Sequence, residues 1–202
     1  QDIHTITAAK IYNVEPNDVS REQRGNAKTV NFGIIYGVSA FGLSQQTNLS
    51  RSESKIMIDN YFENYPGLKD YMSSQIDFAR NNGYVQTIMG RRRYLQNINS
   101  QNNMLRSGAE RNAINAPIQG SAADIIKRAM IKIDRFLDQS SLQAKMLLQV
   151  HDELIFEVLD NEVEQASKEI SLIMEKACEP VLKLSVPLIV DSGFGDSWAL
   201  AH

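Results

Sequence analysis

Two cations and two aromatic rings recur at four-residue intervals within residues 20–37, namely Arg24, Lys28, Phe32 and Tyr36. On a helix each step of four residues advances the side chain by about 40°, so the four side chains fall within one stripe about 120° wide. Positive groups suit a triphosphate, and flat rings suit a base. The stripe predicts a nucleotide-binding helix, while an amphipathic helix with a basic edge is the alternative that the spacing leaves open.

The boundaries and the glycines of this segment support a helix with a close neighbour. Ser20 and Gln23 form the S-x-x-Q pattern of a capping box at its start. Gly33 and Gly37 weaken a helix unless another group must approach the backbone closely. We expect a bound nucleotide to be that group.

A second group of reactive side chains is His151-Asp152-Glu153, which lies between the apolar stretches 144–150 and 154–158. The two stretches read as strands, so the sequence predicts a hairpin with carboxylates at its tip. Carboxylate oxygens are the ligands that hard divalent cations prefer, and metal-dependent phosphoryl or nucleotidyl transfer is chemistry that uses such ions. The alternative is a turn that carries aspartate only for its backbone preferences.

Polar side chains repeat every fourth residue on another expected helix, at Arg111, Asn115 and Gln119. Such groups can donate to the minor-groove acceptors that every base pair presents. Helix capping or a solvent-exposed face explains the same residues. The run 91–93 is three arginines, which could contact a nucleic-acid backbone or simply keep the surface soluble.

The order Arg24, Lys28, Phe32-Gly33, Tyr36-Gly37 closely resembles the fingers-helix motif of family A DNA polymerases, the bacterial polymerase I-like enzymes. The resemblance covers essentially the whole chain, since it continues through Asp2-Ile3-His4, residues 111–119, residues 149–153 and the ending Gly195-Asp196-Ser197-Trp198 to His202. Many relatives carry a second arginine after the first, where this chain has Gly25.

The resemblance implies an α+β fold and a DNA-directed DNA polymerase that acts in DNA replication and repair. Residues 1–83 would be mainly the helical fingers, and residues 84–202 the end of the fingers and the C-terminal half of an antiparallel-sheet palm. Its partners would be primer-template DNA and deoxynucleoside triphosphates, and its cofactor two Mg²⁺ ions. The intact enzyme would be a monomer in the cytoplasm, associated with the nucleoid.

The resemblance also assigns roles to individual residues. His4, Arg24 and Lys28 would contact the triphosphate, with Lys28 also stabilising or protonating the leaving pyrophosphate. Phe32 and Tyr36 would pack against sugar and base. The remaining roles are minor-groove contacts from Arg111, Asn115 and Gln119, contacts at the primer end from Gln149 and His151, and metal binding by the catalytic carboxylates Asp152 and Glu153.

Two further expectations follow from the resemblance. The family supplies a second metal-binding carboxylate from a strand upstream of the segment that matches Asp2-Ile3-His4, so we expect a fragment that does not extend primers alone. Primer extension by the purified chain would contradict this. Phenylalanine at position 32 resembles relatives that discriminate against sugars lacking the 3′ hydroxyl.

Composition limits the alternatives. The chain has 202 residues, is 43% hydrophobic and carries a net charge of −3, which allows one large or two small cores. Residues 80–135 hold ten basic and three acidic residues, whereas residues 136–202 hold four and twelve. A phosphate-binding surface fits the middle segment, and ordinary solvent-exposed faces are the alternative. The lone Cys178 excludes an internal disulfide and fits a reducing cytosol. No apolar run approaches the roughly 20 residues of a membrane span.

Two other functions remain open at this point. A non-catalytic nucleic-acid-binding module would use the basic middle segment but not the paired acids. A two-metal phosphohydrolase would use Asp152 but not the stripe of cations and rings.

The expected elements follow from caps, periodicity and turn residues. We expect helices over 2–13 and 20–37, one after Ser50, one from Pro66 to near Gly83, one from about Leu105 to Leu137 that breaks at Pro117, and one over 161–184. Strands are expected over 84–88, 91–95, 144–150, 154–158 and 186–190.

Overall fold

The chain folds into two compact units. The computed structural model describes residues 2–201, apart from the side chain of Ile35. Unit 1 contains the chain up to Gln86 together with Arg91–Ile118, and unit 2 contains Thr87–Gly90 together with the chain from Gln119 onward. Helices and two small antiparallel sheets make up the units, so the expected α+β fold is confirmed.

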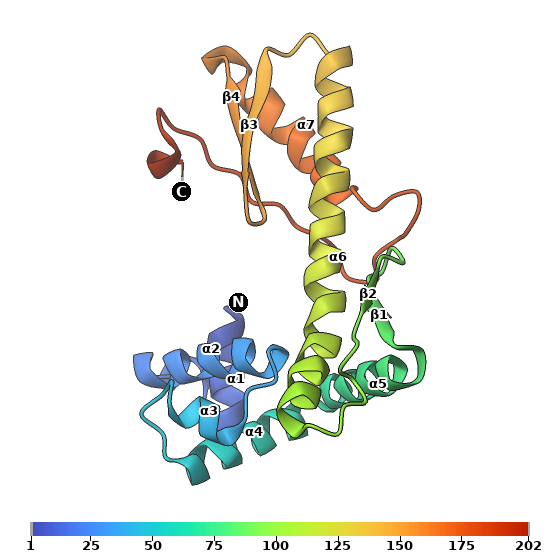
Figure 1. Ribbon diagram of the computed structural model, residues 1–202. Coiled ribbons are helices and arrows are strands. Elements are labelled where there is room, and N and C mark those ends of the chain that lie inside the picture. Colours follow the sequence, from blue (N-terminus) through green and yellow to red (C-terminus); the bar gives the residue numbers. More distant parts are fainter. Residues whose placement is uncertain (1, 202) are drawn as a thin grey trace. The chain divides into compact units, whose positions relative to one another are not determined.

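Unit 1 is mostly helical (Figure 1). In chain order it contains α1 (Ile3–Tyr12), a 3₁₀ turn (Pro16–Asp18), α2 (Arg21–Ile35), α3 (Ala40–Ser44), α4 (Arg51–Asn64), α5 (Pro66–Asn82), the antiparallel strands β1 (Tyr84–Gln86) and β2 (Arg92–Tyr94), and the first part of α6 (Asn103–Gln139). The short helix α3 was not expected from the sequence. The β1–β2 hairpin is the expected one with shorter strands.

The local signals for helix ends are confirmed in unit 1. Ser20 and Gln23 form a complete capping box at α2, and Ser50 and Glu53 form another at α4. Each box satisfies N–H groups that have no partner inside the helix. Helix α5 begins at Pro66 and is closed by Gly83, which has a φ of 77° that favours glycine.

Two apolar clusters hold unit 1 together. The first packs α1 to α4 around buried Val30, Ile34 and Leu43, and the second packs α5, the β1–β2 hairpin and the start of α6 around Val85 and Ala113. The first cluster fixes the inner face of α2. The opposite face of α2, which carries the stripe of cations and rings, is left at the surface.

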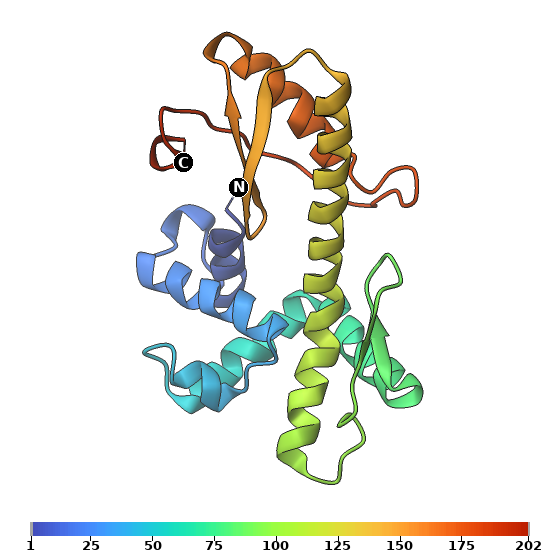
Figure 2. The same ribbon diagram turned by 45° about the horizontal axis from the view of Figure 1, so that its top comes forward.

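Unit 2 packs a two-stranded sheet against two helices (Figure 2). Strands β3 (Ala144–Val150) and β4 (Glu153–Val158) pair antiparallel, with a bulge between Met146 and Leu148. Their inner face meets the second part of α6 and helix α7 (Val163–Glu175), which follows a 3₁₀ turn (Asp160–Glu162); another 3₁₀ turn (Trp198–Leu200) lies near the end. The core includes Ile133, Ile170, Leu154 and Phe156.

The expected break at Pro117 is wrong, because α6 is one continuous helix from Asn103 to Gln139. A proline in a helix interior removes one hydrogen bond and costs roughly 3 kcal/mol. Apolar residues on both sides of Pro117 offset this loss, since Ala113 belongs to the core of unit 1 and Ile133 to that of unit 2. Among the described residues, no helix is long and apolar enough to cross a membrane.

Two expectations near the C-terminus are also wrong. Helix α7 ends at Glu175 instead of near Leu184. Pro180 has no N–H group to bond the Lys176 carbonyl, so the helix cannot continue through it without losing a hydrogen bond. Lys132 Nζ donates to the carbonyls of Lys176 and Glu179, at 2.8 and 2.7 Å. Residues 186–190 form no strand, since no neighbouring strand among the described residues pairs with them.

Candidate functional site

Helices α1 and α2 of unit 1 are joined at the surface by an ion pair. Asp2 caps α1, because its Oδ2 atom accepts hydrogen bonds from the Thr5 backbone N–H at 2.9 Å and from the Thr5 hydroxyl at 2.6 Å. Arg24 donates to the same carboxylate through Nε at 2.8 Å and Nη2 at 3.3 Å. These bonds hold the pKa of Asp2 well below its usual value and raise the pKa of Arg24.

His4 is fixed in the first turn of α1 by a side chain of α2. Its Nδ1 atom lies 3.0 Å from Asn31 Nδ2, and Asn31 Oδ1 accepts a hydrogen bond from the Thr7 hydroxyl at 3.2 Å. Because an amide nitrogen can only donate, Nδ1 of His4 accepts, and the ring hydrogen resides on Nε2. Asn31 and Thr7 are buried, so they hold the imidazole ring in place. The ring also contacts Phe32, with centroids 5.7 Å apart.

Three of the four predicted stripe residues line one surface groove. Lys28, Phe32 and Tyr36 lie along it, and the groove has a volume of about 590 Å³. Phe32 and Tyr36 are each about half exposed, so they are not core residues. Arg24 is not part of the groove wall and instead pairs with Asp2. The other lining residues are Thr29, Gly33, Gly37, Val38, Ser39, Gly42, Gln46 and Arg111.

The two glycines are approached by this chain's own side chains, where we expected a nucleotide. A Cβ atom on Gly33 would lie 2.8 Å from Val38 Cγ1, and one on Gly37 would lie 2.7 Å from Arg111 Cγ. Helix α2 ends at Ile35, so Gly37 lies beyond it, with a φ of 69°. The glycines therefore allow the loop and α6 to pack closely against the groove.

The predicted minor-groove residues lie on one continuous helix. Arg111 lines the groove of unit 1, and Asn115 follows one turn later with its Oδ1 atom buried and without a hydrogen-bond partner among the described residues. A buried acceptor of this kind is costly unless a donor reaches it. Gln119, one further turn along α6, is exposed and is the first α6 residue of unit 2.

The predicted carboxylates lie at the tip of the β3–β4 hairpin in unit 2. Val150 pairs with Glu153, so His151 and Asp152 form a two-residue turn, and His151 has a φ of 53°. Gln149 Nε2 donates to the carbonyl of His151 at 3.0 Å, which braces the turn. The expected hairpin is confirmed, although Glu153 is the first residue of β4 and not part of the turn.

The donor chemistry at this tip fits a divalent cation. Asp152 is exposed and Glu153 is partly exposed, and both offer hard oxygen ligands. Among the described residues, no three histidine, cysteine or acidic side chains gather closely enough to form a metal site. Two carboxylates supply part of the six or so ligands that such ions take.

The structure thus separates the predicted residues into two groups. Unit 1 holds His4, Arg24, Lys28, Phe32, Tyr36, Arg111 and Asn115, whereas unit 2 holds Gln119, Gln149, His151, Asp152 and Glu153. Within unit 1, Lys28, Phe32, Tyr36 and Arg111 line one groove, and His4 contacts Phe32.

The arginine run 91–93 has partners within unit 1. The Arg92 guanidinium lies 4.5 Å from the centroid of the Tyr84 ring, and Arg93 Nη2 donates to Asn112 Oδ1 at 3.3 Å. All three arginines remain exposed. They order the β1–β2 hairpin, and their contact with a nucleic-acid backbone stays a prediction.

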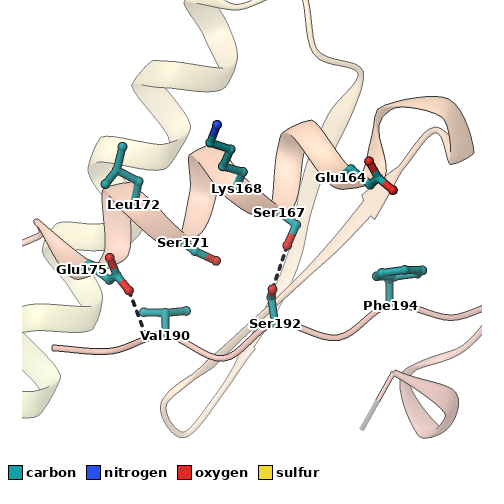
Figure 3. A pocket seen from close by; sticks show the side chains of 9 residues that line it. All are labelled: Glu164, Ser167, Lys168, Ser171, Leu172, Glu175, Val190, Ser192 and Phe194. Atoms are coloured by element: carbon teal, nitrogen blue, oxygen red, sulfur yellow. Dashed lines mark hydrogen bonds between the residues drawn. The ribbon is translucent and has the colours of Figure 1, made fainter.

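Unit 2 has a groove of its own, between α7 and the segment 190–194 (Figure 3). Ser167 and Ser192 are joined by a hydrogen bond of 2.8 Å across it, and the Val190 N–H donates to Glu175 Oε1 at 3.4 Å. None of the predicted site residues lines this groove.

Sequence reasoning gave no role to Asp2 or Asn31, although both fix predicted site residues. Asp2 occupies the cap position just before a helix, two residues before His4. This position is a sequence signal for its capping role. No sequence pattern indicates Asn31, because its role depends on how α1 crosses α2.

Comparison with known proteins gives matches over the whole chain. Residues 1–200 match the family described as DNA polymerase family A. The chain is 51% identical over 198 residues to DNA polymerase I of Streptococcus pneumoniae serotype 4, covering 98% of this chain and 22% of that protein. It is 48% identical over 201 residues to DNA polymerase I of Pseudomonas aeruginosa, covering 100% of this chain and 22% of that protein. The chain therefore spans about a fifth of the length of these relatives.

A solved structure is also similar to this chain. It is the POL domain of Pol1 from M. smegmatis in complex with DNA primer-template and dNTP, with a TM-score of 0.93 and 43% sequence identity. The similarity covers 100% of this chain and 35% of that one.

Proposed function

Because the chain belongs to DNA polymerase family A, we propose that it is a segment of a DNA-directed DNA polymerase. Such an enzyme joins a deoxynucleotide to the 3′ hydroxyl of a primer paired with a template. The observation that carries the proposal is the groove of unit 1, which brings the cation Lys28 and the half-exposed rings of Phe32 and Tyr36 to one surface next to Arg111. The partners of the similar Pol1 domain, primer-template DNA and dNTP, support it.

The deoxynucleoside triphosphate would bind along α2. Lys28 is exposed at the groove, and the Nε2–H of His4 and the guanidinium of Arg24 add donors beside it. The rings of Phe32 and Tyr36 offer apolar faces to the sugar and base. This order of groups along the stripe matches the order of phosphate, sugar and base in a nucleotide.

Lys28 would act on the leaving group. As the new phosphodiester bond forms, the bond to the β-phosphate breaks and pyrophosphate leaves with added negative charge. An ammonium group next to it can neutralise that charge or donate a proton to the departing oxygen. Both actions lower the barrier to the chemical step. They leave the affinity for DNA unchanged.

Asp152 would hold a divalent metal ion, with Glu153 beside it. Family A polymerases use divalent metal ions, and we propose Mg²⁺ because its preferred ligands are carboxylate oxygens. When bound, the ion supplies a Lewis acid that stabilises charge on the phosphoryl oxygens. The hydrogen bond from Gln149 to the His151 carbonyl braces the turn that carries Asp152.

The DNA duplex would contact the remaining predicted residues. Arg111, Asn115 and Gln119 repeat along α6 and would donate to the minor-groove acceptors common to all base pairs, while Gln149 and His151 would contact the primer end. For Asn115 the donor in this role would be the Nδ2 amide group, because its Oδ1 atom is buried and can only accept. We further propose that unit 1 contains the fingers and unit 2 the C-terminal half of the palm, in a monomeric, cytoplasmic enzyme that associates with the nucleoid.

The substitution Asp152→Asn tests this function in the polymerase that contains this sequence. It removes one negative charge at nearly constant shape, so we expect primer extension in Mg²⁺ to fall by about a hundredfold or more while the Kd for primer-template DNA changes little. Asp160→Asn is the matched control, because Asp160 is an exposed acid of the same unit outside the hairpin tip. Full extension activity in Asp152→Asn would contradict the proposal.

A further inference from the structure

Asp2 serves two helices at once. It caps α1 through the two hydrogen bonds from Thr5, and it binds the guanidinium of Arg24 on α2. We propose that Asp2 is a positioning residue, which orients Arg24 for the triphosphate of the incoming nucleotide. This inference rests on the proposed function, since it requires that Arg24 bind phosphate.

The geometry of the pair leaves part of Arg24 available. A guanidinium carries five N–H donors in a fixed plane. Asp2 takes the edge formed by Nε and Nη2, at 2.8 and 3.3 Å. Both hydrogens of Nη1 and the second hydrogen of Nη2 are directed away from that edge. Arg24 can therefore donate to a phosphate without releasing Asp2.

The carboxylate is itself held in place. Thr5 donates to Oδ2 from its backbone and from its hydroxyl, so rotation of the Asp2 side chain would break both bonds. His4 belongs to the same helical turn and is fixed to Asn31 of α2. As a result, two candidate phosphate ligands, His4 and Arg24, share one frame built from α1 and α2.

The ion pair between Asp2 and Arg24 is too exposed to contribute much to folding stability. The side chains of Arg24 and Asp2 are 48% and 39% exposed, and exposed ion pairs contribute little to stability. The larger effect is that Asp2 restricts the Arg24 side chain to one conformation. An unrestrained arginine samples many rotamers and loses that freedom when it binds a ligand. Ordering the side chain beforehand removes this cost from nucleotide binding.

Asp2→Asn separates this role from helix capping, because asparagine is as good an N-cap as aspartate but carries no charge. We would measure steady-state kinetics in the polymerase that contains this sequence, with Mg²⁺ and saturating primer-template. The expected result is a rise of roughly three- to tenfold in the KM for dNTP, the change that ordering one long side chain produces. The kcat and the Kd for primer-template should stay unchanged.

The matched control is Asp59→Asn. Asp59 forms an exposed ion pair of 2.6 Å with Lys55 on α4, in the same unit. Loss of the Asp59 charge should leave the KM for dNTP unchanged. A KM for Asp2→Asn that is unchanged would overturn the inference, and a lower KM would mean that Asp2 competes with the nucleotide instead of orienting Arg24.

A double-mutant cycle decides whether Asp2 acts through Arg24. In an Arg24→Ala background, Asp2→Asn should raise the KM for dNTP no further. An equal rise in both backgrounds would show an effect independent of Arg24 and would overturn the inference. If Arg24→Ala alone leaves the KM for dNTP unchanged, the triphosphate role in the proposed function fails as well, so the two failures are distinguishable.

Discussion

The backbone of Gly37 packs against the side chain of Arg111, so closely that a Cβ atom at position 37 would lie 2.7 Å from Arg111 Cγ. Gly37 also has a φ of 69°, which other residues rarely adopt. The contact joins the loop after α2 to α6. It therefore fixes the wall of the groove that Lys28, Phe32 and Tyr36 line.

Gly37→Ala should destabilise unit 1 by about 1–3 kcal/mol, because alanine meets both an unfavourable backbone conformation and the side chain of Arg111. Urea denaturation followed by circular dichroism measures the change. The matched control is Gly25→Ala within α2, where no atom lies within 4 Å of the added Cβ. There we expect stabilisation by about 0.5–1 kcal/mol, since alanine favours a helix. Equal stability of Gly37→Ala and the wild type would contradict the close packing.

The capping box of α4 should make stability depend on pH. Hydrogen bonds from Ser50 lower the pKa of Glu53 below its usual value of 4.5. Because the folded-state pKa is the lower one, the stabilisation is complete above about pH 5 and is lost as the pH falls through the folded-state pKa. Glu53→Gln keeps the box, as Gln23 does in α2, but cannot titrate. The Tm difference between wild type and Glu53→Gln should therefore shrink between about pH 6 and pH 3. A difference independent of pH would contradict this.

Phe32→Tyr should relax discrimination against dideoxynucleotides. The Phe32 ring is half exposed in the groove, so a hydroxyl fits there and adds a donor beside the sugar, where the missing 3′ hydroxyl leaves a polar group unpaired. We expect the preference for dNTP over ddNTP, measured as a ratio of kcat/KM values, to fall by about tenfold or more. Phe41→Tyr, an exposed ring on α3, is the matched control and should not change the ratio. Unchanged ddNTP incorporation by Phe32→Tyr would argue against a sugar contact.

Local signals in the sequence predicted most of the helices. Caps at Ser20 and Ser50, the proline that starts α5 and Gly83 at its end each act through neighbouring backbone groups, so they can be read without tertiary structure. The prediction for α6 failed because contacts between residues far apart in the sequence determine where this helix ends. Apolar residues that pack on both sides of Pro117 keep α6 continuous.

The predicted site residues show the same contrast between local patterns and long-range contacts. Four-residue spacing placed Lys28, Phe32 and Tyr36 on one surface, because that relation is built into a helix. The spacing could not show that Arg24 pairs with Asp2, or that Val38 and not a ligand packs against Gly33. Those contacts depend on the crossing of α1 and α2 and on the path of the loop after α2.

The most direct test of the proposed polymerase function is Lys28→Ala in the polymerase that contains this sequence. If Lys28 acts on the triphosphate and the leaving pyrophosphate, the single-turnover rate of nucleotide incorporation should fall by about a hundredfold or more, while the Kd for primer-template DNA changes by less than about twofold. Lys55→Ala, which removes an exposed lysine of α4, should leave both quantities unchanged. Loss of DNA affinity in Lys28→Ala with an unaltered incorporation rate would contradict the account and favour a module that only binds nucleic acid.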